Sequence, residues 1–320
     1  MSSHVVNPTT STRWRSRSTT DVATTPLEVR QRTLQVALGV IWLVDAALQF
    51  QPFMFTKAFV TGALEPAASG NPWLLYQPMV WADHLMVHDI AWWNALYATL
   101  QLAIALGLFW RPAVRLALGV SIVWSLAVWW LAEGFGGVFS GGSPLAGQPG
   151  AVVLYAVIAF LIWPSDNGGA SSVVDAGAWG RRGAIATWVV LWVDFAVYFL
   201  LPANRAPQAM HDLVLGTASS EPGWVQSIDH GFASVFAGRG LAFSLGLAAL
   251  SLAIALAVAR PALVRPALVA AMVFAAFVWL VQDFGGTLTA QGTDVNSGPL
   301  IALLAWTFWP LSASRESATR

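Results

Sequence analysis

Cysteine is absent from this chain of 320 residues. The chain therefore forms no disulfide bond, offers no thiolate to a metal ion, and performs no dithiol redox chemistry with its own side chains. Any role in electron transfer would require a bound cofactor or a protein partner.

Charged residues are also scarce, because only 10% of the chain is Asp, Glu, Lys or Arg while 57% is hydrophobic. A water-soluble domain could not cover its surface with so little charge, so lipid must surround much of the molecule. A phosphate-cradling Gly loop with Lys and a Ser/His/Asp hydrolase signature are missing too, which argues against nucleotide-driven transport by this chain alone. We expect the lipid bilayer, and no nucleic acid, as a partner.

The polar segment 1–32 is rich in Ser, Thr and Arg. It lacks the short apolar stretch followed by a small-residue cleavage site that defines a signal peptide. We interpret it as a disordered cytoplasmic tail.

Eight apolar stretches approach the roughly 20 residues that a bilayer core requires. The predicted spans lie near residues 33–52, 91–110, 113–133, 147–163, 184–202, 240–259, 262–282 and 298–310. The fold class expected from them is an all-α polytopic membrane protein with eight transmembrane helices.

An internal repeat supports this count, since three short motifs on separate helices recur at one spacing. Asp45, Arg111-Pro112 and Phe135-Gly136-Gly137 return 149 positions later as Asp194, Arg260-Pro261 and Phe284-Gly285-Gly286. The expected units are a first four-helix unit at 33–164, a cytoplasmic linker at 165–183, a second four-helix unit at 184–310 and a cytoplasmic tail at 311–320. Because each unit has an even number of spans, the two repeats are parallel.

Basic residues predict the orientation, because Lys and Arg are retained on the cytoplasmic side of short loops. With the N-terminus inside, only Lys57, Arg205 and Arg239 lie outside. The thirteen others lie inside, and they are Arg13, Arg15, Arg17, Arg30, Arg32, Arg111, Arg115, Arg181, Arg182, Arg260, Arg265, Arg315 and Arg320. We therefore expect a multi-pass protein of the inner (plasma) membrane with both termini in the cytoplasm.

Acidic residues follow the opposite distribution, which makes the extracytoplasmic face acidic. Five lie inside, namely Asp21, Glu28, Asp166, Asp175 and Glu316, and the other eleven lie outside or in the membrane. Such a face would concentrate cations or protons. A simpler explanation is that the distribution rule excludes Lys and Arg from the outside and leaves the acids behind.

Asp45 and Asp194 lie inside otherwise apolar helices, about 10 Å below the outer boundary at roughly 1.5 Å per residue. A carboxylate at such a depth should face the bundle, and no Lys or Arg at matching depth is available as its partner. We expect hydrogen bonds to Trp, Tyr or backbone groups, or to a His from the outer connection. The pair is a candidate for proton or cation binding, and the alternative is a helix–helix hydrogen bond retained from the ancestral unit.

The first outer connection places His84 and His88 four residues apart, on one face if the segment is helical. This spacing can seat a divalent metal ion, with Asp83 or Asp89 as a further ligand or as a group that orients a ligand. The second copy keeps Asp229-His230 but has Ser234 in place of the second His. The alternative is that these His residues are interfacial, with their polar tips in water.

The third helix of each unit runs through an acid into Phe-Gly-Gly, and the acid is Glu133 in the first copy and Asp283 in the second. Consecutive glycines suit a helix end that frames a small ligand, but also a simple helix cap followed by a tight loop. The later segment 292–299 contains Asp, Asn and Ser. This composition resembles a short cation-coordinating loop, and Asx-turn chemistry explains it as well.

This layout, with Asp in the first helix, an amphipathic outer connection and an inner Arg-Pro turn, resembles the DoxX-like membrane proteins in tandem. The closest local matches are Gly39–Asp45 and Arg111-Pro112. The resemblance implies quinone-associated oxidoreduction or maturation of extracytoplasmic redox enzymes, and it assigns no catalytic residue.

Three functions remain open from the sequence. The first is a redox-associated or accessory protein whose outer face docks a membrane or extracytoplasmic protein partner, or a quinone. The second is a small-solute, proton or metal-cation transporter with its site between the repeats. The third is a purely structural assembly factor. A quinone or a divalent metal is the expected cofactor, and whether the chain is an enzyme stays open.

Overall fold

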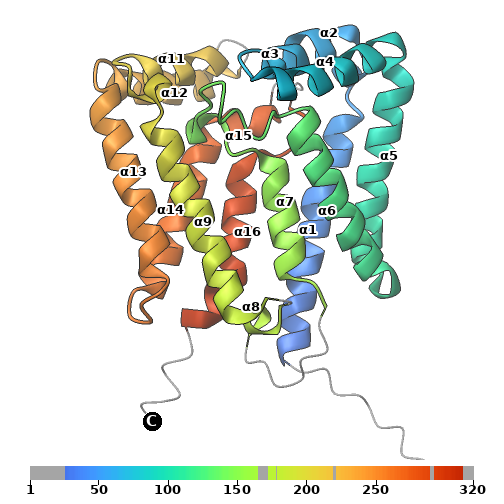
Figure 1. Cartoon of the computed structure of the whole chain (residues 1–320), viewed down its shortest axis with the longest axis vertical. Helices are drawn as coiled ribbons and strands as arrows, with labels where there is room; N and C mark the ends of the chain where they lie inside the picture. The colour runs from blue at the N-terminus through green and yellow to red at the C-terminus, as the bar shows by residue number, and fades with distance from the viewer. Residues whose placement is uncertain (1–25, 165–171, 178, 219–220, 289–291, 313–320) are drawn as a thin grey trace, which may run out of the picture.

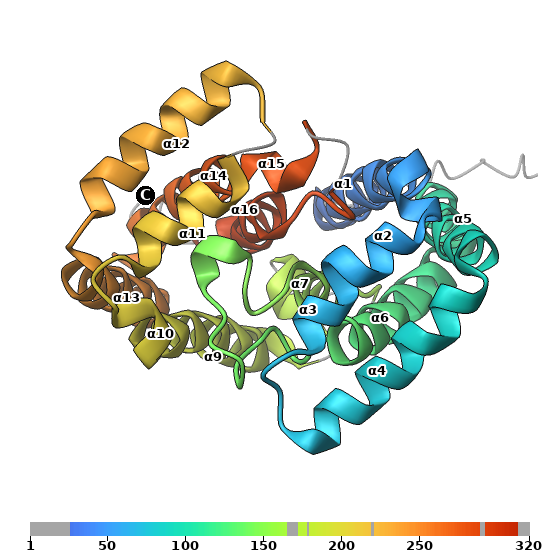
Figure 2. The same ribbon diagram turned by 90° about the horizontal axis from the view of Figure 1, so that it is seen from above.

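The computed structural model describes residues 26–164, 172–177, 179–218, 221–288 and 292–312, and across these residues the chain is helical without a strand. Six long helices run side by side around two shorter ones (Figures 1 and 2). The long ones are α1 (Pro26–Gln49), α5 (Ile90–Phe109), α6 (Val114–Leu131), α9 (Gly180–Leu200), α13 (Gly240–Ala257) and α14 (Val264–Val281). The shorter central helices are α7 (Ala151–Leu161) and α16 (Ser297–Phe308).

Five helical segments are long and apolar enough to cross a membrane, and they comprise α5, the stretch Arg111–Leu131 that contains α6, α9, α13 and α14. α7 and the stretch Ser297–Leu311 are apolar but shorter. α1 is 24 residues long, yet its buried polar residues Gln35, Asp45 and Gln49 reduce its apolar character. Five of the eight predicted spans therefore meet the criteria for a membrane span.

The long helices expose large apolar side chains to the outside of the bundle. The most exposed are Leu116, Val123, Val190, Leu256 and Val273, each at least 65% exposed. Large apolar side chains exposed in this way are unfavourable in water and favourable against lipid tails. The helical bundle is accordingly compatible with an integral membrane protein.

One end of the bundle, here called the lid end, is covered by short helices that lie across it (Figures 1 and 2). The first group comprises η1 (Pro52–Phe55), α2 (Lys57–Phe59), η2 (Val60–Leu64), α3 (Glu65–Ala68) and α4 (Trp73–His88). The second comprises α10 (Pro202–Arg205), α11 (Ala209–Ala218) and α12 (Gly223–Phe236). Trp73, Trp81 and Trp224 point outward from α4 and α12 and are more than half exposed, as expected for rings at the headgroup level.

The opposite end carries the start of α1, the turn η3 (Arg111–Ala113), α8 (Val173–Ala176) and η5 (Trp309–Ser312) (Figure 1). The first and last described residues therefore lie at the same end of the bundle. The chain therefore runs along the length of the bundle an even number of times between these two residues.

Neighbouring helices pack in the same order in both halves of the chain. In the first half α1 packs against α5, α5 against α6, and α6 against α7. In the second half α9 packs against α13, α13 against α14, and α14 against α16. α7 and α16 contact each other at the centre and join the two halves.

The helices α6 and α14 also end alike. Phe135 and Phe284 both adopt positive φ, at 56° and 54°. Each ring packs against a Trp of the preceding helix, with centroids 4.9 Å apart for Trp129–Phe135 and 5.0 Å apart for Trp279–Phe284. The first Phe-Gly-Gly motif therefore forms a turn after α6, and the second lies within the one-turn helix α15 (Asp283–Gly286) that follows α14. The loop after α6 contains η4 (Pro144–Ala146).

The segment boundaries differ from the sequence prediction at the start of the chain. α1 begins at Pro26 rather than at residue 33, so residues 26–32 are helical and are not part of a disordered tail. Arg32, in the second turn of α1, ties this helix to α5, because its guanidinium donates to the carbonyl oxygens of Leu108, at 2.6 Å, and Phe109 at the end of α5. Favourable interaction of a cation with a helix C-terminus explains the contact. α8 likewise occupies part of the predicted linker 165–183.

Candidate functional site

Two loops bring polar backbone groups into the interior at the lid end. One runs from α6 to α7 and the other from α15 to α16. Trp129 Nε1 donates to the carbonyl oxygen of Pro149 at 2.6 Å, and Trp279 Nε1 donates to that of Val295 at 3.0 Å. These bonds fix the loops directly before the first turns of the two short central helices.

Asp45 lies at the point where these elements meet and is only 1% exposed. The hydroxyl of Tyr155 on α7 donates to its Oδ2 in a short hydrogen bond, and the backbone N–H of Val295 donates to its Oδ1 at 3.0 Å. The expectation of Tyr and backbone partners for Asp45 is confirmed. The carboxyl group therefore links α1 to α7 and to the loop of the second half.

Glu133 lies beside the N-terminus of α7, where the backbone N–H of Val152 donates to its carboxyl group. The partial positive charge of a helix N-terminus favours an acid at this place. The Oε2 atom of Glu133 is buried without a hydrogen-bond partner among the described residues.

Asp294 precedes α16 in a similar position. Its Oδ1 accepts from the backbone N–H of Asn296 at 2.6 Å, which is an Asx turn, and its Oδ2 accepts from the hydroxyl of Thr293 at 3.2 Å. Burial raises the pKa of Asp294, and these two hydrogen bonds lower it in part. Local turn chemistry therefore accounts for the composition of the segment 292–299.

Asp83 projects from the underside of the lid helix α4 and is 3% exposed. Its Oδ2 atom has no hydrogen-bond partner in the part of the chain that the structure describes. Burial, with a smaller effect from the charge of Glu65, raises the pKa of Asp83 to about 6, against a lowering effect of His84. The chain thus holds this acid beneath the lid without a local partner.

His84 and His88 lie on the exposed side of α4, away from Asp83. The Nδ1 atom of His88 is 2.6 Å from the carbonyl oxygen of His84, so the ring forms a bond within its own helix. Across the described residues no three His, Cys, Asp or Glu side chains come close enough to hold one metal ion. The structure does not bring the two His residues together with the buried acids.

Four carboxyl groups instead line one cavity of about 890 Å³, here called the lid chamber. They belong to Asp45, Asp83, Glu133 and Asp294. The volume lies within the range of roughly 300–1,000 Å³ that is typical of sites for small molecules. No Lys, Arg or His is found among the described residues that line it. The chamber therefore gathers acidic groups without a basic counterpart.

The acids of the second half lie outside this chamber. Asp194 on α9 is partly exposed, and no hydrogen bond joins its carboxyl group to another described residue. Asp229 on α12 is fully buried, and burial raises its pKa while the neighbouring His230 lowers it. His230 itself is exposed. Asp283 falls in α15, and the position of its side chain lies outside the described part of the structure.

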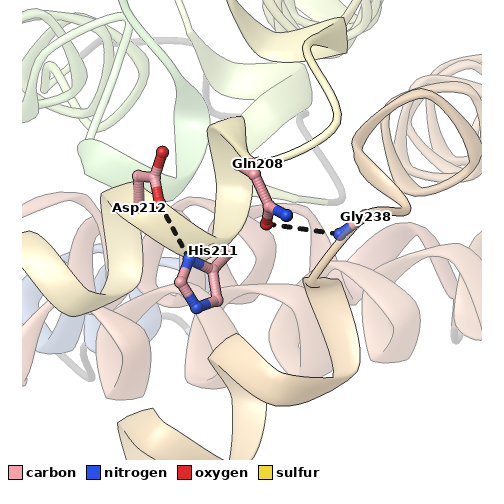
Figure 3. A network of polar contacts seen from close by, with 4 residues as sticks. All are labelled: Gln208, His211, Asp212 and Gly238. Atoms are coloured by element: carbon pink, nitrogen blue, oxygen red, sulfur yellow. Dashed lines mark hydrogen bonds and ion pairs between the residues drawn. The ribbon is translucent and has the colours of Figure 1, made fainter.

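A further polar network of the second half lies on the surface (Figure 3). His211 Nδ1 lies 2.8 Å from Oδ1 of Asp212, and the Gln208 side chain accepts from the backbone N–H of Gly238 at 3.3 Å. The Asp212 side chain is 70% exposed. The Gln208 bond ties the chain just before α11 to the turn before α13, and none of the four residues of the network lines the chamber.

Two residues that complete the site, Tyr155 and Val295, were not predicted from the sequence. They lie 110 and 250 positions from Asp45 along the chain, so no local spacing could connect them. The one usable signal was Tyr155, the single residue with a polar group in the apolar helix α7.

Comparison with family models, curated proteins and solved structures found no match for this chain. The functional assignment therefore depends on the geometry of the chain itself.

Proposed function

We propose that the chain is a plasma-membrane protein with eight spans, built from two parallel four-helix repeats in a tandem DoxX-like layout. The equal packing order of the two halves supports the repeat. The matched Trp–Phe pairs at the ends of α6 and α14 support it as well. In this arrangement each of the short helices α7 and α16 crosses the membrane together with the loop that precedes it. The loop spans part of the bilayer, so the helix itself can be short.

The lid end is the extracytoplasmic end in this proposal. Arg111 and Arg260 belong to turns at the opposite end, and Arg115 and Arg265 lie at the adjoining starts of α6 and α14, whereas Lys57 belongs to a lid helix. Retention of basic residues in the cytoplasm then places both termini inside. The lid chamber consequently faces the periplasm or cell exterior.

The function that the geometry supports best is binding of a small solute from the extracytoplasmic side, as part of its uptake or presentation. The observation that supports this function is the lid chamber. It has the volume of a small-molecule site, and both halves of the chain contribute to its walls. Its polar groups include buried oxygen atoms of Asp83 and Glu133 that have no partner among the described residues, and a bound molecule would satisfy them.

Filling the chamber tests this function. Ala127 on α6 lines the chamber, so the variant Ala127→Trp should occupy the space of a ligand. Val123 lies one turn earlier on the same helix and is 70% exposed, so Val123→Trp is a matched control that adds the same ring on the outer surface. Native mass spectrometry of protein released from membranes should detect a bound small molecule in wild type and Val123→Trp, and not in Ala127→Trp. Absence of any bound molecule from wild type, or its retention in Ala127→Trp, contradicts the proposal.

A redox-associated role with a quinone is the second candidate, as the DoxX-like layout implies. The observation in its favour is the aromatic wall of the chamber, where Trp42 and Tyr155 have ring centroids 4.3 Å apart. A quinone needs hydrogen-bond donors for its carbonyl groups, however, and the Tyr155 hydroxyl already donates to Asp45. The four carboxyl groups of the chamber can accept hydrogen bonds, which favours a solute that donates. The mass of the bound molecule in the experiment above distinguishes the two.

A further inference from the structure

We infer that the solute of the lid chamber is an organic cation of the substituted-ammonium class, an inference that rests on the proposed solute-binding function. The chamber is lined by four carboxyl groups and, among its described residues, by no basic side chain. A bound cation would supply the missing positive charge. Burial would strengthen this attraction, because the interior screens charges less than water does.

The surroundings of Asp45 favour its role as the central anion of the site. Both of its oxygen atoms accept hydrogen bonds, and both donors, the Tyr155 hydroxyl and the Val295 N–H, are uncharged. Hydrogen bonds of this kind stabilise a carboxylate without neutralising its charge. A cation bound beside Asp45 would favour the ionised form of its carboxyl group, so the two charges would stabilise each other.

Five aromatic side chains, those of Trp42, Phe59, Tyr97, Trp124 and Tyr155, are among the described residues that line the chamber. Trp42 and Tyr155 pack together beside Asp45, and Tyr97 and Trp124 pack with their centroids 5.1 Å apart, all four lining the chamber. The faces of such rings attract ammonium groups, and cages of aromatic residues are a general means of binding quaternary ammonium. The combination of rings and acids fits a bulky organic cation better than a sugar or an anion.

A bare metal ion fits the arrangement less well. A metal ion requires several ligand atoms at about 2.0–2.6 Å, and the described acids are too far apart to form such a set. An organic cation spreads its charge over a larger volume, so separated carboxyl groups can each interact with it. Asp83 would then close the site from above, since it points inward from the lid helix without a partner of its own.

The second half lacks the groups that would make a second site of this kind. Val295 and Pro149 each precede the first residue of a central helix, and Pro149 has no N–H to donate. Tyr155 lies five positions after Gly150, and the residue five positions after Asn296 is Ile301, which has no hydroxyl group. Asp194 therefore has neither of the two donors that hold Asp45. One cation per chain is the expected stoichiometry.

The test uses choline and its uncharged isostere 3,3-dimethylbutan-1-ol, which share a shape and differ by one positive charge. Isothermal titration of the full-length protein in lipid nanodiscs should show saturable binding of one choline per chain. The isostere should bind at least about tenfold more weakly, and choline binding should be lost in Ala127→Trp and kept in Val123→Trp.

Equal affinity for the two probes, or no choline binding at millimolar concentration, overturns the inference of a cation. The proposed function still stands in that case if Ala127→Trp loses the molecule detected by native mass spectrometry. If wild type carries no such molecule and binds neither probe, both the inference and the proposed function fail.

Discussion

Gly136→Ala is expected to lower the melting temperature of the detergent-solubilised protein by roughly 10 °C, the largest stability effect that we predict. Gly136 has a φ of 70°, and a Cβ at this position would lie 2.1 Å from the carbonyl oxygen of Pro149. The left-handed conformation costs an L-residue about 1–2 kcal/mol, and overpacking against backbone adds about 1–3 kcal/mol. The clash cannot be relieved by a side-chain rotation, because its partner is a backbone atom.

Gly246→Ala is the matched control for this substitution. Gly246 lies within α13, and a Cβ there would meet no atom within 4 Å. Replacing Gly by Ala inside a helix removes chain entropy from the unfolded state, so the melting temperature should stay constant or rise slightly. Equal melting temperatures for Gly136→Ala and Gly246→Ala would show that the loop from α6 to α7 is not packed as described.

Asp45→Asn is expected to raise the dissociation constant for choline about tenfold or more, whereas Asp194→Asn should leave it unchanged. Loss of a charge-assisted interaction costs about 1.5–3 kcal/mol, and each 1.4 kcal/mol is tenfold in affinity. Asp45 lines the chamber and Asp194 does not. Titration of both variants with choline measures the difference directly.

Comparison of Asp45→Asn with Asp194→Asn distinguishes a single site in the first half from a site shared by the two repeats. The sequence presented Asp45 and Asp194 as equivalent, and a site shared between them would make both substitutions equally harmful. In the structure the two acids differ in their hydrogen-bond donors, since Tyr155 and the backbone N–H of Val295 donate to Asp45 and not to Asp194. Equal loss of choline binding in the two variants would contradict a single site in the first half.

The sequence was sufficient for the helical membrane character of the chain and the order of its helices, because long apolar stretches have few alternatives to helices in lipid. It was less informative about where the helices begin. The beginning of α1 is held by hydrogen bonds from Arg32 to the end of α5, the first of them to a residue 76 positions away. A local sequence pattern carries no information about such a contact. The short α7 depends likewise on the loop that ends at Pro149.

The candidate site was predictable only in part. Asp45 was visible as an acid in an apolar helix, and its need for uncharged donors followed from the absence of basic residues at its depth. The sequence does not show which face of α4 is buried, because Asp83 and His84 are adjacent in sequence, yet Asp83 is buried and His84 is exposed. Only tertiary packing shows which of them lies beneath the lid.

The most direct test of the account is labelling of a single cysteine in the lid chamber, since the chain contains no other cysteine. Ala132 lines the chamber, so Ala132→Cys should react with a membrane-impermeant maleimide added outside intact cells, and choline should slow that reaction. Labelling that occurs only after the membrane is opened, or at a rate that choline does not change, would contradict a solute chamber open to the extracytoplasmic side.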